Sequence, residues 1–213
     1  MSEAKRARTL GAVLYEDFEL LDVYGPLEMF GSVGTELRIV TVAERAGPVR
    51  SFQGPRTVAE FDFATAPELD LILLPGGFGT MRELENPAML DFLRRRSAAA
   101  EVTMSVCSGS ALLAKAGLLD GRRATSNKMF FQVARSQSDR VEWVTAARWG
   151  SLSPSSSSSR VGPRRVVRGS SVAVRCSSPG RGKGVLISLP TLRGATPGRR
   201  CGSRPAERPA GGG

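Results

Sequence analysis

Short apolar runs alternate with segments of helical periodicity over the first two thirds of this chain, and this alternation constrains the fold more than any other feature. The runs at 9–15, 69–74 and 102–106 are almost wholly apolar, as expected of strands that are buried on both faces of a parallel sheet. Between them, residues 20–30 and 88–100 place apolar side chains at helical spacing. Strands separated by helices fold as a parallel sheet with helices on both faces. We therefore predict an α/β domain with a doubly wound parallel sheet.

Shorter elements complete this prediction. Pro26 is expected in the first turn of its helix, where a missing N–H costs little, and Gly117 is expected as a helix C-cap. Asn86-Pro87 is expected to open the helix over 88–100. The remaining expected elements are a strand at 36–43, a short hairpin arm at 57–63, a helix at 111–116, a strand at 124–126, a helix at 128–136 and a strand at 141–144.

The α/β pattern stops at Trp149. Residues 1–149 hold 18 Lys+Arg and 19 Asp+Glu, a net charge of −1, whereas residues 150–213 hold 12 basic residues and one acid, a net charge of +11. This last segment is rich in Ser, Gly, Arg and Pro, a composition that cannot bury enough apolar surface to offset the entropy of ordering. We predict a disordered N-terminus at 1–8, one domain at 9–149 and a disordered basic tail at 150–213, with at most a marginal strand near 185–187.

Charge and length exclude several classes of function. Because the net charge of +10 lies entirely in the tail, only loose, salt-dependent contact with nucleic acid is expected, and no specific nucleic-acid site. No apolar run approaches the roughly 20 residues that a membrane helix requires. The basic start, MSEAKRART, lacks the apolar core of a secretory signal. We expect a soluble, cytoplasmic protein without membrane partners.

The cysteines are Cys107, Cys176 and Cys201, and their spacing gives neither a disulfide framework nor a metal-binding signature. A reducing compartment and no metal site are expected. Histidine is absent, which removes the commonest general base and the commonest metal ligand. Any catalysis must therefore use another base.

Cys107 is the candidate nucleophile because it lies between a predicted strand and a predicted helix, at the sheet edge where α/β proteins bind ligands. The Cys-Ser-Gly pattern is similar to a nucleophile elbow, in which small neighbours such as Gly109 permit a strained turn. A helix N-terminus favours negative charge, so we expect a lowered thiol pKa. The alternative is a buried structural cysteine, the commoner fate of a single cysteine.

Two further groups are candidates to act with this thiol. Gly76 and Gly77 end the adjacent strand, and their N–H groups, with that of Ser108, are placed to bind a developing oxyanion. The alternative for this pair is a tight turn that needs positive φ. Asp22, set among apolar residues, is either a helix N-cap, the commoner case, or a buried acid with a raised pKa that exchanges protons with the thiol or the substrate.

Four segments, in this order, resemble the ThiJ/PfpI superfamily of class I glutamine-amidotransferase-like proteins, and its isonitrile-hydratase-like branch most closely: 15–30, 73–77, 105–110 and 116–125. The resemblance covers about 9–149. It implies a flavodoxin-like, three-layer sandwich that is usually dimeric and uses no metal or organic cofactor. It also implies addition of water to an isonitrile carbon, giving an N-substituted formamide.

The resemblance also assigns roles. Cys107 would attack or orient the substrate, Asp22 would exchange protons, and Ser108, where such hydratases usually have threonine, would hold the intermediate. Many relatives have histidine where this chain has Asn127, so a Cys–His protease-like mechanism is out of reach. The predicted catalytic residues are thus Cys107, Asp22 and Ser108, and the predicted oxyanion- or substrate-binding residues are Gly76, Gly77 and Gly109.

The chain departs from this pattern after Arg148-Trp149, where relatives continue with a strand, a Ser-Ser-Gly turn and a long closing helix. Those closing elements are expected to be missing, and with them part of the sheet cover and the homodimer face. The composition break is typical of translation in a wrong reading frame or through a retained intron. Two alternatives to a small-molecule enzyme therefore stay open: a non-catalytic redox-sensing or protein-binding member of the fold, and an inactive product.

Overall fold

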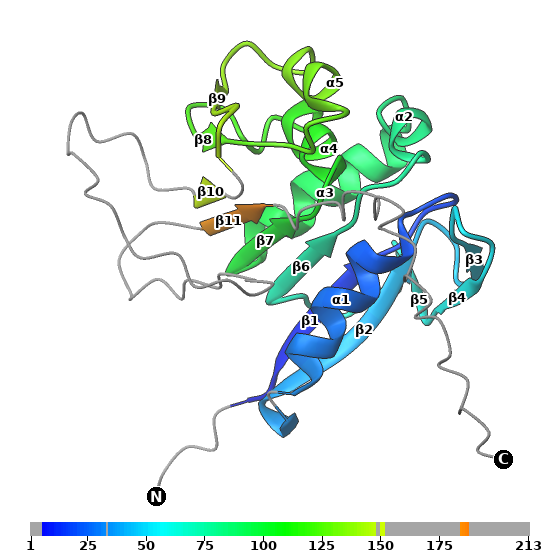
Figure 1. Cartoon of the computed structure of the whole chain (residues 1–213). Coiled ribbons are helices and arrows are strands. Elements are labelled where there is room, and N and C mark those ends of the chain that lie inside the picture. The colour runs from blue at the N-terminus through cyan, green and yellow to red at the C-terminus, as the bar shows by residue number, and fades with distance from the viewer. Residues whose placement is uncertain (1–5, 33, 148–149, 152–183, 188–213) are drawn as a thin grey trace, which may run out of the picture.

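The computed structural model describes residues 6–32, 34–147, 150–151 and 184–187. Within these residues the central sheet has seven strands in the order β10-β11-β7-β6-β1-β2-β5 (Figure 1). Neighbours run parallel, except that β10 runs antiparallel to β11. The strands are β1 (Arg8–Val13), β2 (Leu37–Ala43), β5 (Phe61–Asp62), β6 (Leu71–Leu74), β7 (Val102–Ser105), β10 (Gly150–Ser151) and β11 (Gly184–Ile187).

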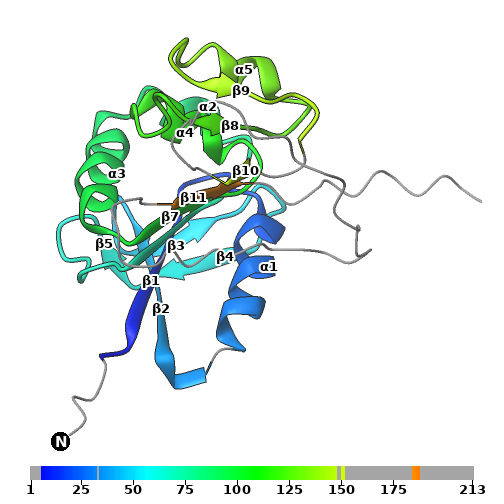
Figure 2. The ribbon, with the colours of Figure 1, turned by 90° about the vertical axis from the view of Figure 1, so that its left-hand side faces the viewer.

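Helices cover both faces of the sheet, so the predicted doubly wound, three-layer α/β sandwich is confirmed. Figure 2 shows α1 on one side of the sheet and α3 on the other. The helices are α1 (Leu20–Gly31), the 3-10 turn η1 (Gly34–Glu36), α2 (Thr80–Glu83), α3 (Pro87–Ala99), α4 (Gly109–Lys115) and α5 (Phe131–Arg135). Two small pairs lie outside the main sheet: the antiparallel β3 (Gly47–Arg50) and β4 (Arg56–Ala59), and the parallel β8 (Arg123–Ala124) and β9 (Glu142–Trp143).

The core explains why the central strands read as continuous apolar runs. Along β6, Ile72 and Leu74 join a cluster that also contains Phe92 of α3 and Leu112 of α4. The alternate residues of β6 join a second cluster, which contains Phe30 of α1. Since successive side chains of a strand point to opposite faces, a strand covered on both faces has no polar alternation.

Local signals set several element ends as predicted. Asn86 caps α3 by accepting hydrogen bonds from the N–H groups of Ala88 at 3.0 Å and Met89 at 3.4 Å, and Pro87 is the first helical residue. Gly117 follows α4 with φ of +76°, the left-handed conformation expected at a C-cap.

Other expectations were wrong. Pro26 is the seventh residue of α1, not part of its first turn; the buried position of its ring outweighs the loss of one helical hydrogen bond. The helix expected at 128–136 is shortened to α5, because the Asn127 side chain accepts the N–H of Met129 at 2.8 Å and holds this segment in a loop. The arm expected at 57–63 divides between β4, which pairs with β3, and β5, which extends the main sheet.

The two ends of the domain differ in detail from the predicted boundaries. β1 begins at Arg8, inside the segment predicted as a disordered N-terminus, and Arg6 forms an ion pair with Asp70 at 2.6 Å. The segment predicted as a disordered tail with at most a marginal strand near 185–187 supplies β10 and β11 to the main sheet, and β11 lies parallel to β7, so the sheet continues past residue 149. The rest of the predicted tail, 152–183 and 188–213, lies outside the described residues, as do 1–5.

Candidate active site

Cys107 stands where β7 meets α4, at the elbow that the sequence predicts. The N–H of Val106 donates to Leu74 O at 2.9 Å, which keeps the elbow beside the end of β6. Cys107 then turns with φ of +55°, a left-handed conformation that is unfavourable for a residue with a side chain. Strain of about 1 kcal/mol or more at such a position persists only where the surroundings enforce it.

Glycines make this elbow possible because backbone passes very close to backbone. A Cβ on Gly76 would lie 2.6 Å from the Ser108 nitrogen and 2.8 Å from the Cys107 Cβ. A Cβ on Gly109 would lie 2.6 Å from Pro75 O. Gly77 has φ of +136°, so the tight-turn interpretation is correct for this residue, whereas Gly76 is required for close approach.

Asp22 faces the elbow from the first turn of α1. The helix N-cap is Glu19, so the N-cap interpretation of Asp22 is wrong and the buried-acid interpretation is right. Its side chain is buried and accepts the Gly76 N–H at 3.0 Å. Since Gly76 abuts Cys107, the carboxyl lies close enough to the thiol to act on it electrostatically. Burial, which disfavours the charged form, raises the pKa of Asp22 to about 7.

The thiol itself has a raised pKa, contrary to the sequence-based expectation. Burial, followed by the nearby Asp22 carboxyl, raises the pKa of Cys107 to about 12, and hydrogen bonds from Asn127 and Ser108 offset this in part. The helix N-terminus does not compensate, because α4 has seven residues and its first N–H, that of Gly109, is bonded to Val106 O at 3.0 Å. The resting group is therefore a thiol rather than a thiolate.

Asn127 contacts the sulfur directly. Its Nδ2 lies 2.8 Å from Cys107 Sγ, and both groups are buried. Ser110 donates to Ser126 Oγ at 2.8 Å, and Ser126 donates to the carbonyl oxygen of Cys107 at 3.4 Å, which fixes the elbow backbone. The sequence singled out Asn127 only as the residue that stands where many relatives have histidine.

Ser108 belongs to a chain of hydroxyl groups that the sequence did not indicate. The Tyr15 hydroxyl donates to Pro75 O at 2.8 Å and lies 3.0 Å from Thr80 Oγ1, which lies 2.9 Å from Ser108 Oγ. Each hydroxyl has one hydrogen. Since Tyr15 uses its hydrogen on Pro75, Thr80 donates to Tyr15 and Ser108 donates to Thr80.

Two of the three expected oxyanion donors, the N–H groups of Gly76 and Gly77, have partners within the protein, and so has the N–H of Gly109. The N–H of Gly76 is bonded to Asp22, that of Gly77 to Ser108 Oγ at 3.1 Å, and that of Gly109 to Val106 O. An anionic intermediate would have to share or replace these bonds. The structure thus brings the six predicted site residues together, with hydrogen bonds from Gly76 to Asp22 and from Gly77 to Ser108.

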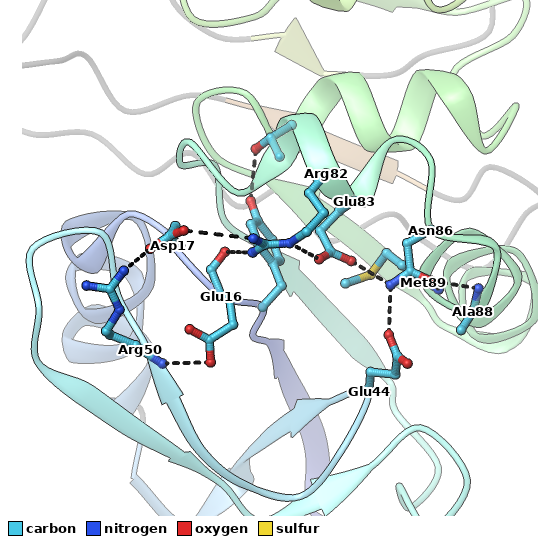
Figure 3. A network of polar contacts seen from close by, with 11 residues as sticks. Glu16, Asp17, Glu44, Arg50, Arg82, Glu83, Asn86, Ala88 and Met89 are labelled. Carbon is cyan, nitrogen blue, oxygen red and sulfur yellow. Dashed lines mark hydrogen bonds and ion pairs between the residues drawn. The ribbon is translucent and has the colours of Figure 1, made fainter.

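A polar network supports the loops that carry the site (Figure 3). Arg82 of α2 donates to Glu16 O at 2.9 Å, and Arg50 of β3 pairs with Asp17 at 2.9 Å. The Asn86 amide donates to Glu83 at 2.8 Å and, across a gap of 42 residues in sequence, to Glu44 at 2.7 Å.

A cavity of about 810 Å³ lies along this network, with Tyr15, Glu16 and Glu83 in its lining. Asp22, Cys107 and Ser108 do not line it. Within the described ranges, no three His, Cys, Asp or Glu side chains are placed to hold a metal ion. None of the helices in the described part of the chain combines the length and apolarity needed to cross a membrane.

Known proteins are similar to this chain in sequence and in structure. Isonitrile hydratase of Pseudomonas putida is 36% identical over 121 residues, which are 57% of this chain and 53% of that protein. Protein/nucleic acid deglycase 2 of Escherichia coli is 25% identical over 126 residues, 57% of this chain and 72% of that protein. The chain thus spans about half the length of the isonitrile hydratase that it matches.

Among solved structures, a ThiJ/PfpI family protein from Pseudomonas syringae aligns with a TM-score of 0.62 and 26% identity, covering 86% of this chain and 63% of the other. The model of the DJ-1/PfpI family matches residues 10–152, which contain all six predicted site residues. The chain belongs to the DJ-1/PfpI family.

Proposed function

We propose that this protein is a cysteine-dependent hydratase of small molecules and that its substrates are isonitriles. The observation that carries the proposal is that the buried Asp22 carboxyl and the Cys107 thiol meet at Gly76, beside Ser108: Asp22 accepts the Gly76 N–H, Gly76 abuts Cys107, and the carboxyl acts electrostatically on the thiol. The 36% identity to an isonitrile hydratase supports the substrate class, while the similarity to a deglycase makes α-oxoaldehydes the competing class to test.

The pKa order supports a thiol addition assisted by a base. At neutral pH Cys107 carries its proton, and Asp22, with a pKa of about 7, is partly ionised. As the sulfur forms a bond to the isonitrile carbon, Asp22 accepts the thiol proton and passes it to that same carbon. The product of this step is a thioimidate, Cys–S–CH=N–R, with no net change in charge.

Water completes the reaction. It adds to the thioimidate carbon, and proton transfer through Asp22 gives Cys–S–CH(OH)–NH–R. The C–S bond then breaks, the sulfur regains a proton and R–NH–CHO leaves. In this scheme Ser108 holds the hydroxyl-bearing intermediate and Asn127 stabilises developing charge on the departing sulfur, which its Nδ2 contacts at 2.8 Å.

The test is formamide production by the purified full chain from benzyl isonitrile in ¹⁸O-water, followed by mass spectrometry. Label in the formyl oxygen that disappears in Cys107→Ala supports the proposal. If the chain turns over methylglyoxal but no isonitrile, the proposed substrate class changes from isonitriles to α-oxoaldehydes. A cooperatively folded chain that converts neither compound would favour the non-catalytic alternative, and a chain without a cooperative melt would favour the inactive product.

The raised thiol pKa weighs against the redox-sensing alternative, because easily oxidised cysteines are exposed and have low pKa values. Besides the substrate, we propose a second copy of this chain as a partner, so that the protein forms a homodimer. Leu21 and Tyr24 of α1 lie three residues apart and are 56% and 47% exposed, as on a helix face that a second copy would cover. Sedimentation velocity of the full chain and of Leu21→Lys tests this, since a monomer in both would contradict it.

A further inference from the structure

Three phenylalanine rings, Phe52, Phe78 and Phe130, form a partly exposed aromatic cluster. The centroids of Phe52 and Phe78 lie 4.5 Å apart with the rings tilted by 37°, and those of Phe78 and Phe130 lie 5.7 Å apart with the rings at 90°. Phe52 is 49% exposed and Phe78 is 51% exposed. Contacting rings usually bury most of their surface, so this cluster has apolar area left to offer a ligand.

The cluster is carried by segments that contact the elbow. Gly76 abuts Cys107, and Phe78 follows Gly76 by two residues, so the Cα atoms of Gly76 and Phe78 are at most about 7 Å apart. The Asn127 side chain contacts the Cys107 sulfur, and Phe130 follows Asn127 by three residues, so the Cα atoms of Asn127 and Phe130 are at most about 11 Å apart. The contact between the two rings therefore bridges two segments that both meet Cys107.

Phe52 joins the cluster from the β3–β4 turn. Its N–H donates to Phe18 O at 2.9 Å, and Phe18 forms a β-bridge with Gly77. Backbone pairing through Phe18 thus connects this turn to the loop that carries Gly76 and Gly77, independently of the contacts between the rings. Three segments that are distant in sequence hold one aromatic cluster next to the elbow.

We infer that the aromatic cluster is the part of the site that receives the substituent of the substrate and that it selects isonitriles with a planar aromatic group. This inference rests on the proposed function. An isonitrile is linear, so its substituent projects straight away from the carbon that the sulfur attacks. A flat ring can stack on the exposed face or edge of Phe78, whereas a methyl group is too small to make this contact.

The first experiment compares kcat/KM for phenyl and methyl isonitrile. The wild-type chain should prefer phenyl isonitrile by at least about tenfold. Phe78→Ala should remove most of this preference by lowering kcat/KM for phenyl isonitrile far more than for methyl isonitrile, and Phe78→Leu, which keeps apolar bulk without the ring, should do the same. Val58→Ala, at an exposed apolar position on β4, is the control. An equal loss for both substrates in both Phe78 variants would overturn the inference, because it would indicate a structural role.

A second measurement does not depend on hydratase activity. In a Cys176→Ser, Cys201→Ser background, the rates at which N-phenylmaleimide and N-methylmaleimide alkylate Cys107 are measured. The ratio of the phenyl rate to the methyl rate is then divided by the same ratio for free N-acetylcysteine, which corrects for the intrinsic reactivity of the two reagents. We expect a ratio of about three or more that falls to one in Phe78→Leu. A normalised ratio of about three or more in a chain that turns over no isonitrile would refute the proposed function and keep the aromatic subsite. A normalised ratio of one in the Cys176→Ser, Cys201→Ser chain would refute the subsite.

Discussion

Asp22 and Glu83 are two buried carboxyl groups near the carboxyl end of the same sheet, and their surroundings differ. Asp22 is 8% exposed and Glu83 is 6% exposed, and burial is the largest cause of a raised pKa in both. Glu83 accepts from the Asn86 amide and lies 3.7 Å from the Arg82 guanidinium. Asp22 accepts a glycine N–H and faces a thiol.

This difference separates a structural acid from a candidate proton carrier. The Asn86 amide that donates to Glu83 caps α3, so this carboxyl joins α2 to the start of α3. The neighbour of Asp22 is the Cys107 thiol, which can itself release a proton and belongs to a residue held at φ of +55°. Burial alone therefore does not identify the functional acid; its neighbours do.

The largest expected effect is a difference in catalytic activity between a variant at the Asp22–Cys107 site and a variant at Glu83. Cys107→Ala should lower isonitrile hydration by about 10³-fold or more, since it removes the atom that forms the covalent bond. Glu83→Gln should change kcat/KM by less than about threefold. Both are measured by formamide release, with circular dichroism to establish that each variant is folded. Substantial activity in a folded Cys107→Ala chain would refute the covalent mechanism.

The second prediction concerns Asp22→Asn, which keeps the shape and the Gly76 hydrogen bond but removes proton exchange. We expect kcat/KM to fall about 10²-fold. In the parent chain kcat/KM should rise with pH through about 7, as Asp22 ionises and becomes able to accept the thiol proton. The pH profile of Asp22→Asn should lose this rise, while that of Glu83→Gln should keep it.

The same substitution has a thermodynamic signature. Because the folded-state pKa of Asp22 is raised from 3.8 to about 7, the folded chain binds this proton more tightly than the unfolded chain. The stabilisation is complete below about pH 4 and is lost as pH rises towards 7, so the free energy of unfolding should fall by about 3 kcal/mol over this range. Urea denaturation should show a shallower pH slope in Asp22→Asn; an unchanged slope would contradict the raised pKa.

A third prediction tests the close approach at the elbow. Gly76→Ala should destabilise the fold by about 1–3 kcal/mol, because its Cβ would meet the backbone nitrogen of Ser108. Gly31→Ala, in the last position of α1 with no atom within 4 Å of the added Cβ, should be neutral or stabilise by up to about 1 kcal/mol. Equal effects of the two substitutions, measured by urea denaturation, would show that packing at Gly76 is looser than described.

The smallest expected effect concerns the hydroxyl chain. Thr80→Val and Thr103→Val each remove a buried Thr–Ser hydrogen bond, to Ser108 and to Ser97 respectively, and each should cost about 1 kcal/mol of stability. Thr80→Val should also lower kcat about tenfold, because Ser108 loses the acceptor that orients it. Thr80→Ser should restore kcat, and Thr103→Val should leave it unchanged. A kcat for Thr80→Val equal to that of Thr103→Val would remove Thr80 from a positioning role.

Much of the fold was predictable because its signals are local. The apolar run of β6 has no polar alternation, and Asn86-Pro87 and Gly117 carry their own capping chemistry. The elbow was predictable for the same reason, since Cys107 lies between a strand and a helix and has small neighbours. The start of α5 was mispredicted because the Asn127 side chain binds the backbone there, and nothing in the apolar spacing signals this bond.

The sequence alone indicated the alternation of the central strands with the main helices, the position of Cys107 at an elbow and the family to which the chain belongs, because these depend on residues near one another in the chain. The tertiary structure decided the protonation of the site. Whether Asp22 caps a helix or carries a proton, and whether Cys107 is a thiolate or a thiol, depends on burial and on an electrostatic interaction between residues 85 positions apart. Such electrostatic effects arise only when the folded chain brings these groups together and excludes water from them.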